Sequence, residues 1–205
     1  TLARVVTPLS RLRLGLRDRL GSVSAAVSIE RFDAVPSEVF ASLYRNGAPD
    51  RLHVARDEAF YDWRFENPAW EVTAYVARRD GRPVGGIVAC EEELKGVTCT
   101  RLVDVQPMAP DDDRSAVYAS LLETVVRDGS DTDVYKVAGD VLPDEVLSRF
   151  GFWSDAGFPL SRVGRRTVHV VRPTGPVDRG RWRLQGRDPT EARHWTLSLA
   201  GQDIA

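Results

Sequence analysis

Cysteine, histidine and methionine are all scarce in this sequence. It contains two cysteines, three histidines and one methionine. Two cysteines are too few for the disulfide framework of a small secreted domain, so we expect Cys90 and Cys99 to be reduced strand residues that pack as small apolar groups. Because both flank a predicted hairpin, a contact across the strands is the alternative. The histidines, His53, His169 and His194, have no partner at metal-ligand spacing, and we expect no metal site.

Long apolar runs and an excess of one charge are also missing. No stretch approaches the ~20 apolar residues that cross a bilayer, and no secretion signal is visible. The formal net charge of -2 excludes an overall attraction to nucleic acid or to an anionic membrane. We therefore expect a cytoplasmic protein with no membrane span and no nucleic-acid partner. The chain begins with Thr1 rather than Met, as a piece of a longer protein would.

What the sequence does contain is enough apolar material for a core. Its 205 residues are 42% hydrophobic, which is ordinary for a globular domain. Residues 4–20 carry apolar side chains at helical spacing together with several arginines. Such a basic amphipathic helix docks onto protein or lies on a membrane surface, and we favour docking. We divide the chain into a connector helix and linker over residues 1–22, a domain over 23–175, and a tail over 176–205 that packs on the domain.

Apolar periodicity and turn residues predict the elements of the domain. The first half is expected to contain a strand over 27–32, a helix over 36–44 with Asp33 as its cap, a helix over 57–66 that ends at Asn67-Pro68, and three strands over 70–78, 84–91 and 97–106. The second half is expected to contain a helix over 114–128, a strand over 132–138, a helix over 143–150 ended by Gly151, and a strand over 167–172 before a loop over 173–180.

The order of these elements predicts the fold class. Arg79-Asp80-Gly81-Arg82 and Lys95-Gly96 are turn signals, so the three strands of the first half form an antiparallel meander. The helix over 114–128 joins two strands as a crossover unit, and those strands should be parallel with a right-handed connection. We therefore expect an α/β (α+β) domain with a mixed, mostly antiparallel sheet and helices on both faces.

Several strings of the sequence carry a family resemblance. They are residues 56–58, Trp63-Arg64-Phe65-Glu66-Asn67-Pro68, residues 75–81, 149–152, 159–163 and 195–199, and residues 7–9 and 14–20 of the opening helix. Together with the order of elements, they resemble the GNAT (Gcn5-related N-acetyltransferase) superfamily, and most of all the C-terminal lobe of bipartite haloarchaeal GNAT-like proteins. The resemblance implies the GNAT fold, acetyl-CoA as cofactor and a small-molecule or protein amine as substrate. It also implies a second GNAT-like lobe, in cis or as a homodimer mate.

The loop that holds the cofactor in this family departs from the family's pattern. GNAT enzymes hold the acetyl-CoA pyrophosphate on an Arg/Gln-x-x-Gly-x-Gly/Ala loop at a helix N-terminus, where glycines and free N–H groups accommodate the anion. The matching stretch here runs from Gln106 to Arg114, and its candidate cofactor-binding residues are Gln106, Met108, Ala109 and Arg114. It has no glycine, and its two prolines each remove a donor.

Three aspartates, Asp111 to Asp113, stand in this loop where the pyrophosphate should lie. Their charges would repel the phosphates, since like charges near a surface oppose one another over several ångströms. The structural alternative is that they cap the following helix and complement its dipole. Either way, the sequence predicts a degenerate pyrophosphate loop.

Two residues are candidates for catalytic groups. Asp104 lies in an apolar strand, where desolvation would make its carboxylate a stronger base for an attacking amine. The alternative for Asp104 is a structural hydrogen bond to a neighbouring strand or to Arg101. Tyr118 could donate a proton to a leaving thiolate, or could pack in the core. Arg64 is a candidate contact for an acidic substrate, or shapes the corner between helix and strand together with Trp63 and Asn67.

Two functional hypotheses follow from the sequence. In the first, the chain is a lobe of a GNAT-type N-acyltransferase that transfers an acetyl group from acetyl-CoA to an amine. In the second, it is a non-catalytic recognition or scaffolding lobe, paired with a catalytic GNAT lobe. We expect membership of an N-acetyltransferase family, without independent catalysis by this lobe.

Overall fold

The computed structural model describes residues 26–68, 70–94, 96–108, 114–138, 141–155, 157, 160–162 and 182–201. Several sequence-based predictions lie outside these ranges: the helix over 4–20, nearly all of the linker after it, the strand over 167–172, the loop over 173–180, and the three loop aspartates. In the part of the chain that is described, no helix is both long enough and apolar enough to span a membrane.

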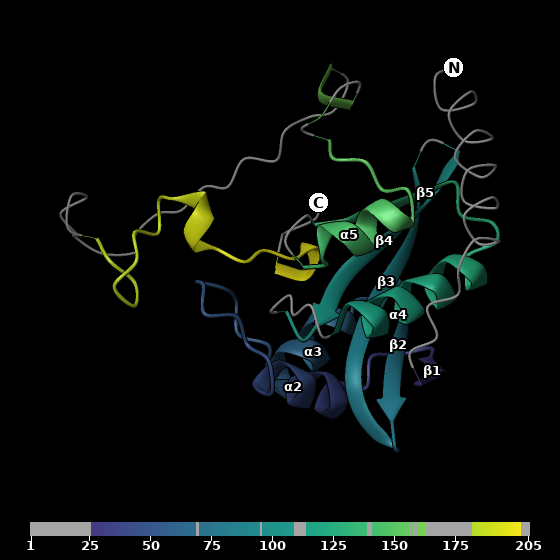
Figure 1. Ribbon diagram of the computed structural model, residues 1–205, viewed down its shortest axis with the longest axis horizontal. Coiled ribbons are helices and arrows are strands. Elements are labelled where there is room, and N and C mark those ends of the chain that lie inside the picture. Colours follow the sequence, from purple (N-terminus) through teal and green to yellow (C-terminus); the bar gives the residue numbers. More distant parts are fainter. Residues whose placement is uncertain are drawn as a thin grey trace.

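In the described residues, a five-stranded sheet forms the centre of the domain (Figure 1). Its strands lie in chain order: β1 (Ser28–Phe32), β2 (Glu71–Arg79), β3 (Arg82–Leu94), β4 (Val97–Gln106) and β5 (Val134–Val137). The first four pair antiparallel, whereas β5 pairs parallel to β4 after the crossover through a helix. The mixed, mostly antiparallel sheet is therefore confirmed, although β3 is longer and β5 shorter than predicted.

The hairpin between β2 and β3 closes through a two-residue turn. Asp80 and Gly81 both adopt positive φ, 52° and 76°, between the paired residues Arg79 and Arg82. Two successive positive φ values match the right-handed twist of the strands that they join, and Asp-Gly tolerates them well. The predicted hairpin is thus confirmed at this turn.

Helices cover both faces of the sheet (Figure 1). One face packs against α2 (Ser37–Arg45) and α3 (Glu58–Phe65), and the other packs against α4 (Ser115–Asp128) and α5 (Asp144–Arg149). Alternate residues of a strand point to opposite faces, so Tyr75 and Ala77 of β2 enter the α4-side core and Ala74 and Val76 enter the α2-side core. This arrangement confirms the predicted fold class.

The sequence predicts caps at the ends of two helices, Asp33 for α2 and Gly151 for α5. Asp33 does not cap α2, because the N-cap is Pro36 and Asp33 instead pairs with Arg31 at 2.7 Å. Asp57 caps α3, since its carboxylate accepts a bond from the Phe60 N–H at 2.8 Å. Gly151 follows the last residues of α5 with φ of 75°, as the sequence predicts.

A bulge in β4 determines which side chains face α3. Val88 pairs with Asp104 but Ala89 pairs with Leu102, so Val103 is an extra residue on β4. Because Asp104 shares a register position with Val88, which packs in the α2-side core, its side chain lies on that face. Farther along, β5 pairs with β4 only over residues 99–102, and the rest of β4 extends beyond it.

The C-terminal segment returns to the domain near the end of β4. It contains the short 3-10 helices η3 (Ala192–His194) and η4 (Leu199–Gly201), and η4 lies beside β4. A parallel bridge joins Trp195 to Leu52, with the Leu52 N–H donating to His194 O and the Thr196 N–H donating to Leu52 O, both at 2.8 Å. The segment therefore reaches the same end of the sheet as α3.

Candidate functional site

A buried carboxylate lies at the centre of the candidate site. Four donors surround Asp104: Tyr61 Oη at 2.7 Å and Gln106 Nε2 at 2.9 Å bind Oδ2, while Ser198 Oγ at 2.9 Å and Arg56 Nε at 3.4 Å bind Oδ1. None of these five residues is more than 1% exposed. We call this group the Asp104 cluster.

Four separate parts of the chain supply the Asp104 cluster. Asp104 and Gln106 alternate along β4 after the bulge, Tyr61 lies on α3, Arg56 precedes α3, and Ser198 belongs to the C-terminal segment. The Arg56 guanidinium is held by three further contacts: Nη1 donates to Val54 O at 3.1 Å, Nη2 donates to Ser198 Oγ at 2.9 Å, and Cζ lies 4.3 Å from the centre of the Phe60 ring. The cluster therefore ties helix, sheet and tail together.

The electrostatics of the Asp104 cluster are those of a compensated buried charge. A carboxylate withdrawn from water is tolerated only when an opposite charge and hydrogen bonds replace its solvation, and Arg56 with three neutral donors supplies both. Burial, followed by the nearby negative charge of Asp104 and the hydrogen bond to it, raises the pKa of Tyr61 well above its ordinary value. Tyr61 therefore stays protonated and keeps donating to Asp104.

The alternative partner predicted for Asp104 is wrong. Arg101 lies near Glu92 and donates to that carboxylate through Nη2, so Arg56 is the cation that meets Asp104. The structure brings the predicted residues Asp104 and Gln106 together, but Arg56, Tyr61 and Ser198 were not among the candidates. Arg56 and Ser198 do lie within the family-like strings, which is the signal that could have found them.

The start of the predicted cofactor loop is turned into the protein. Gln106 and Met108 are fully buried, the Gln106–Pro107 bond is cis, and Ala109 lies outside the described residues. Gln106 Oε1 is buried and accepts no hydrogen bond from any described group. Tyr118 is also fully buried and packs in the α4-side core. Its hydroxyl donates to Pro107 O at 2.9 Å, and this bond holds the start of the loop against that core.

Arg114 lies where the loop meets α4. It is the N-cap residue of α4, and its side chain makes no capping bond, so the three aspartates precede the cap. Arg114 and Arg79 line a cavity of about 210 Å³ together with Asn46 and Pro107. Gly47, which follows the C-cap of α2, packs closely against two of these residues, since a Cβ atom there would lie 2.4 Å from Pro107 Cβ and 2.9 Å from Arg114 Nη1.

Arg64 stacks between two tryptophans. Its Cζ atom lies 4.7 Å from the centre of the Trp70 ring and 6.0 Å from that of Trp63. Trp70 N–H also donates to Asn67 O at 3.1 Å, directly after α3. These contacts support the view that Arg64 shapes the corner between α3 and β2.

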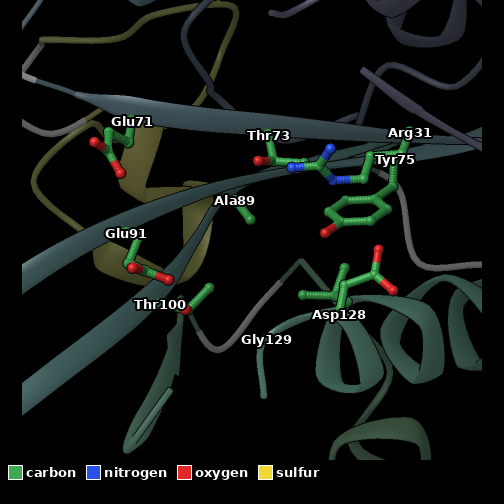
Figure 2. Close-up of a pocket in the computed structure, with 10 residues that line it drawn as sticks. Arg31, Glu71, Thr73, Tyr75, Ala89, Glu91, Thr100, Asp128 and Gly129 are labelled. Atoms are coloured by element: carbon green, nitrogen blue, oxygen red, sulfur yellow. The ribbon is translucent and has the colours of Figure 1, made fainter. Parts of the chain in front are cut away.

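A second cavity opens on the α4 side of the sheet, the face opposite to the Asp104 cluster, beside the C-terminal end of α4 (Figure 2). Its volume is about 450 Å³, and its polar walls include Arg31, Tyr75 and Asp128. Glu71 and Glu91, directly opposite each other on β2 and β3, also face it. Burial, with the negative charge of Asp128, raises the pKa of Tyr75. None of the residues predicted for the site lines this cavity.

The two cysteines are buried and free. Cys90 pairs with Arg101 and Cys99 pairs with Glu92, so the two thiols are diagonal neighbours across β3 and β4 rather than directly opposite. Burial raises the pKa of each thiol. Both therefore pack as protonated, apolar groups.

No protein-family model and no curated protein sequence matches this chain. Solved structures do match. The chain is similar to the crystal structure of a probable acetyltransferase, with a TM-score of 0.52 and 15% identity over 71% of this chain and 99% of that one. The chain has the GNAT fold. The GNAT fold here comprises the four-stranded antiparallel meander, the crossover helix α4 and the parallel strand β5.

Two further acetyltransferase structures match with lower TM-scores. One is ribosomal-protein-alanine N-acetyltransferase from Brucella melitensis biovar Abortus 2308, with a TM-score of 0.46 and 14% identity over 71% of this chain and 98% of that one. The other is an aminoglycoside acetyltransferase from an uncultured soil metagenomic sample in complex with sisomicin, with a TM-score of 0.40 and 14% identity over 73% of this chain and 97% of that one.

Proposed function

We propose that this chain is an acyltransferase-type lobe that does not transfer an acyl group on its own. It serves instead as a recognition or scaffolding lobe beside a second, catalytic GNAT lobe, in cis or in a homodimer mate, that acts on an amine. The observation that carries this proposal is the state of Asp104, the best candidate base on β4, whose carboxylate is buried among four donors.

A general base must reach the proton that it removes. It needs an accessible lone pair within hydrogen-bond distance of the attacking nitrogen. Each oxygen of Asp104 already accepts two donors, and the residue is 0% exposed. Arg56 Nε, at 3.4 Å from Oδ1, places a positive charge beside the carboxylate, where an attacking amine would have to approach. These features support a structural role for Asp104.

The residues of the loop do not fit acetyl-CoA. A pyrophosphate needs several free N–H groups and no nearby carboxylate, whereas this loop has Pro107 and Pro110, no glycine and three aspartates. The side chains of Gln106 and Met108 point into the protein, and Arg114 lies against Gly47 and Pro107. We therefore derive no catalytic step through the cofactor in this lobe.

The second candidate function is N-acyl transfer by this lobe itself, from acetyl-CoA to a small-molecule or protein amine. The likeness to a probable acetyltransferase favours it. Asp104 would then be the base and Tyr118 the proton donor, and both would have to become accessible, because both are fully buried. Two reduced, buried cysteines favour the cytoplasm for either function.

Calorimetric titration of the full chain with acetyl-CoA separates the two functions. The proposal expects no saturable heat from the wild-type chain. Micromolar binding that is lost in Arg114→Ala, but kept in the control Arg51→Ala, would overturn it and support acyl transfer by this lobe. Binding that both variants keep would also overturn it, by showing that the cofactor enters elsewhere on the chain.

A further inference from the structure

The C-terminal strap, residues 195–201, is the part of the chain that closes the Asp104 cluster. Its central contact is Ser198, which donates to Asp104 Oδ1 at 2.9 Å and accepts from Arg56 Nη2 at 2.9 Å. Thr196 and Ala200 on either side are also buried, and Leu199 packs against the α2-side core. At the end of the strap, a Cβ atom on Gly201 would lie 3.3 Å from Arg56 Nη2, so the backbone itself covers the guanidinium.

The strap lies beside a part of the sheet that β5 does not cover. Pairing between β4 and β5 ends at Leu102, and Asp104 follows two residues later. The η4 turn of the strap lies alongside β4 (Figure 1). The strap, rather than a strand of the sheet, therefore shields the Asp104 cluster on this side.

Two backbone hydrogen bonds, among the described residues, hold this end of the chain to the loop before α3. The Leu52 N–H donates to O of His194, directly before the strap, and the Thr196 N–H of the strap donates to Leu52 O. Its buried side chains, at Thr196, Ser198 and Ala200, are small, so opening of the strap would expose these groups together with the partly buried Leu199. Arg56, Tyr61 and Gln106 all belong to the body of the domain and would stay bonded to Asp104.

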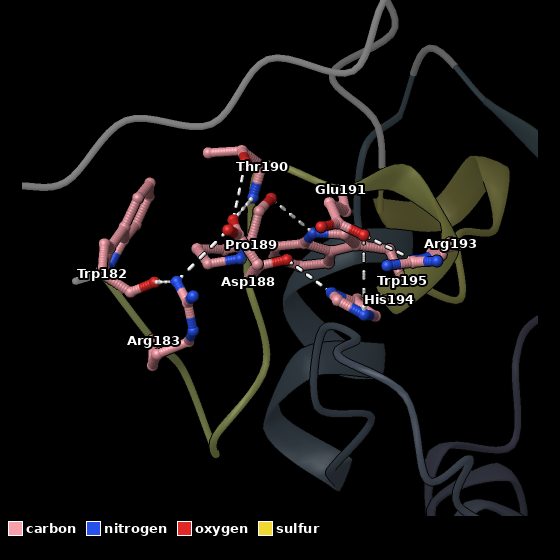
Figure 3. Close-up of polar contacts among 9 residues, drawn as sticks. All are labelled: Trp182, Arg183, Asp188, Pro189, Thr190, Glu191, Arg193, His194 and Trp195. Carbon is pink, nitrogen blue, oxygen red and sulfur yellow. Dashed lines mark hydrogen bonds and ion pairs between the residues drawn. The ribbon is translucent and has the colours of Figure 1, made fainter. Parts of the chain in front are cut away.

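The segment before the strap is folded largely on itself (Figure 3). Asp188 accepts from the Thr190 N–H at 2.9 Å, and its backbone oxygen lies 2.7 Å from His194 Nδ1. Trp195 Nε1 donates to Pro189 O at 2.9 Å. An ion pair from Arg187 Nη2 to Asp50 Oδ2, at 2.7 Å, also joins this segment to the domain. Once that pair separates, a unit with its own internal bonds can move away from the domain without first unfolding, and the strap would move with it.

We propose that the C-terminal strap is a removable cover, and that its opening alone makes the carboxylate of Asp104 accessible. When the strap opens, Oδ1 loses the Ser198 hydroxyl and keeps only the long bond to Arg56 Nε, so one acceptor position becomes free for an incoming donor. The strap thus controls access to the one carboxylate of β4. This inference concerns access to Asp104 and stands whether or not the lobe binds acetyl-CoA.

Carboxyl labelling with a water-soluble carbodiimide and an amine, read by mass spectrometry, tests the proposal on the full chain. Thr196→Pro removes the N–H that bonds Leu52 O, whereas the matched control Thr196→Ala keeps it. We expect at least tenfold faster labelling of Asp104 in Thr196→Pro than in wild type, and a much smaller change in Thr196→Ala. Equal labelling of Asp104 in wild type and Thr196→Pro would overturn the proposal.

Hydrogen exchange on the unmodified chain gives a second test that does not depend on the folding of a variant. The Thr196 amide, which bonds Leu52 O, should exchange at least a hundredfold faster than the Val88 amide in the middle of β3, because the strap opens locally. Exchange of both amides at the same rate would mean that the strap opens only when the whole domain unfolds. That result would overturn the proposal even if the proline variant failed to fold.

Discussion

Tyr61 of α3 donates a hydrogen bond of 2.7 Å to Asp104 of β4, and neither residue is more than 1% exposed. This bond joins the helix layer to the sheet at the bulge, where Asp104 turns toward α3. The same carboxylate also binds Arg56 and Ser198, so one buried charge organises three segments that are distant in the sequence. The arrangement explains how an aspartate can occupy the interior of this fold.

Removal of the Tyr61 hydroxyl should destabilise the domain. Tyr61→Phe leaves Asp104 Oδ2 with one donor fewer, and a buried acceptor that loses a partner costs about 1–3 kcal/mol. Urea unfolding of the wild type and the variant measures this change. Tyr44→Phe is the matched control, because the Tyr44 hydroxyl bonds His53 in a partly exposed place and should cost less. An equal effect of both changes would contradict the proposed importance of the Asp104 cluster.

Arg56 and Asp104 should be strongly coupled. Loss of one partner leaves the other as an uncompensated buried charge, so Arg56→Met or Asp104→Asn is expected to lower the free energy of unfolding by about 3–5 kcal/mol. The double variant should lose clearly less than the sum of the two single changes. Additive losses in this double-mutant cycle would show that the two side chains do not act as a pair.

Alkaline pH should weaken the domain partly through Tyr61. Its pKa is raised in the folded state, so its stabilising contribution is fully present below the pKa of about 10 that a tyrosine has in the unfolded chain. Above that pH the unfolded state loses the proton first, and the free energy of unfolding falls by up to about 1.4 kcal/mol per pH unit. Tyr75 adds to this loss through its own raised pKa.

The contribution of Tyr61 can be isolated by comparison with Tyr61→Phe. The variant has no phenol at that position, so its stability should fall less steeply above about pH 10 than that of the wild type. Parallel stability curves for the two proteins, measured by urea unfolding at each pH, would contradict the raised pKa of Tyr61.

Gly47 should be required for the loop after β4 to pack against the end of α2. A methyl group at this position would overlap Pro107 Cβ at 2.4 Å, and such overpacking costs about 1–3 kcal/mol. Thermal unfolding of Gly47→Ala measures this loss. Gly157→Ala serves as the control, because among the described residues its Cβ atom would meet Ser154 O alone, at an ordinary contact distance of 3.4 Å, and should be tolerated. An unchanged melting temperature for Gly47→Ala would show that the loop is not packed against α2 in this way.

The sheet could be predicted from local signals in the sequence. Asp80-Gly81 is a short-range hairpin signal, and the apolar stripe of the helix over 114–128 predicts a crossover, so the meander and the parallel β5 follow. The boundaries were less accurate. The prediction that Asp33 caps α2 was wrong, because Pro36 is the N-cap and the Asp33 carboxylate forms an ion pair with Arg31 instead.

The Asp104 cluster could be predicted only in part. The position of Asp104 in an apolar strand marked it as unusual, but its partners are distant in sequence, since Ser198 is 94 residues away and contacts an arginine 142 residues before it. The bulge that turns Asp104 toward α3 contains no glycine or proline, so no residue type in the sequence marks its position. Partner choice across such distances depends on tertiary packing and not on a local pattern.

Amide chemical-shift mapping during a titration with coenzyme A tests whether the loop after β4 can hold the pyrophosphate of the cofactor. If prolines and aspartates have closed the loop, the amides of Ser115 and Ala116 at the start of α4 should keep their shifts up to millimolar coenzyme A. Saturable shifts of these amides at micromolar concentration, abolished by Arg114→Ala, would contradict the account.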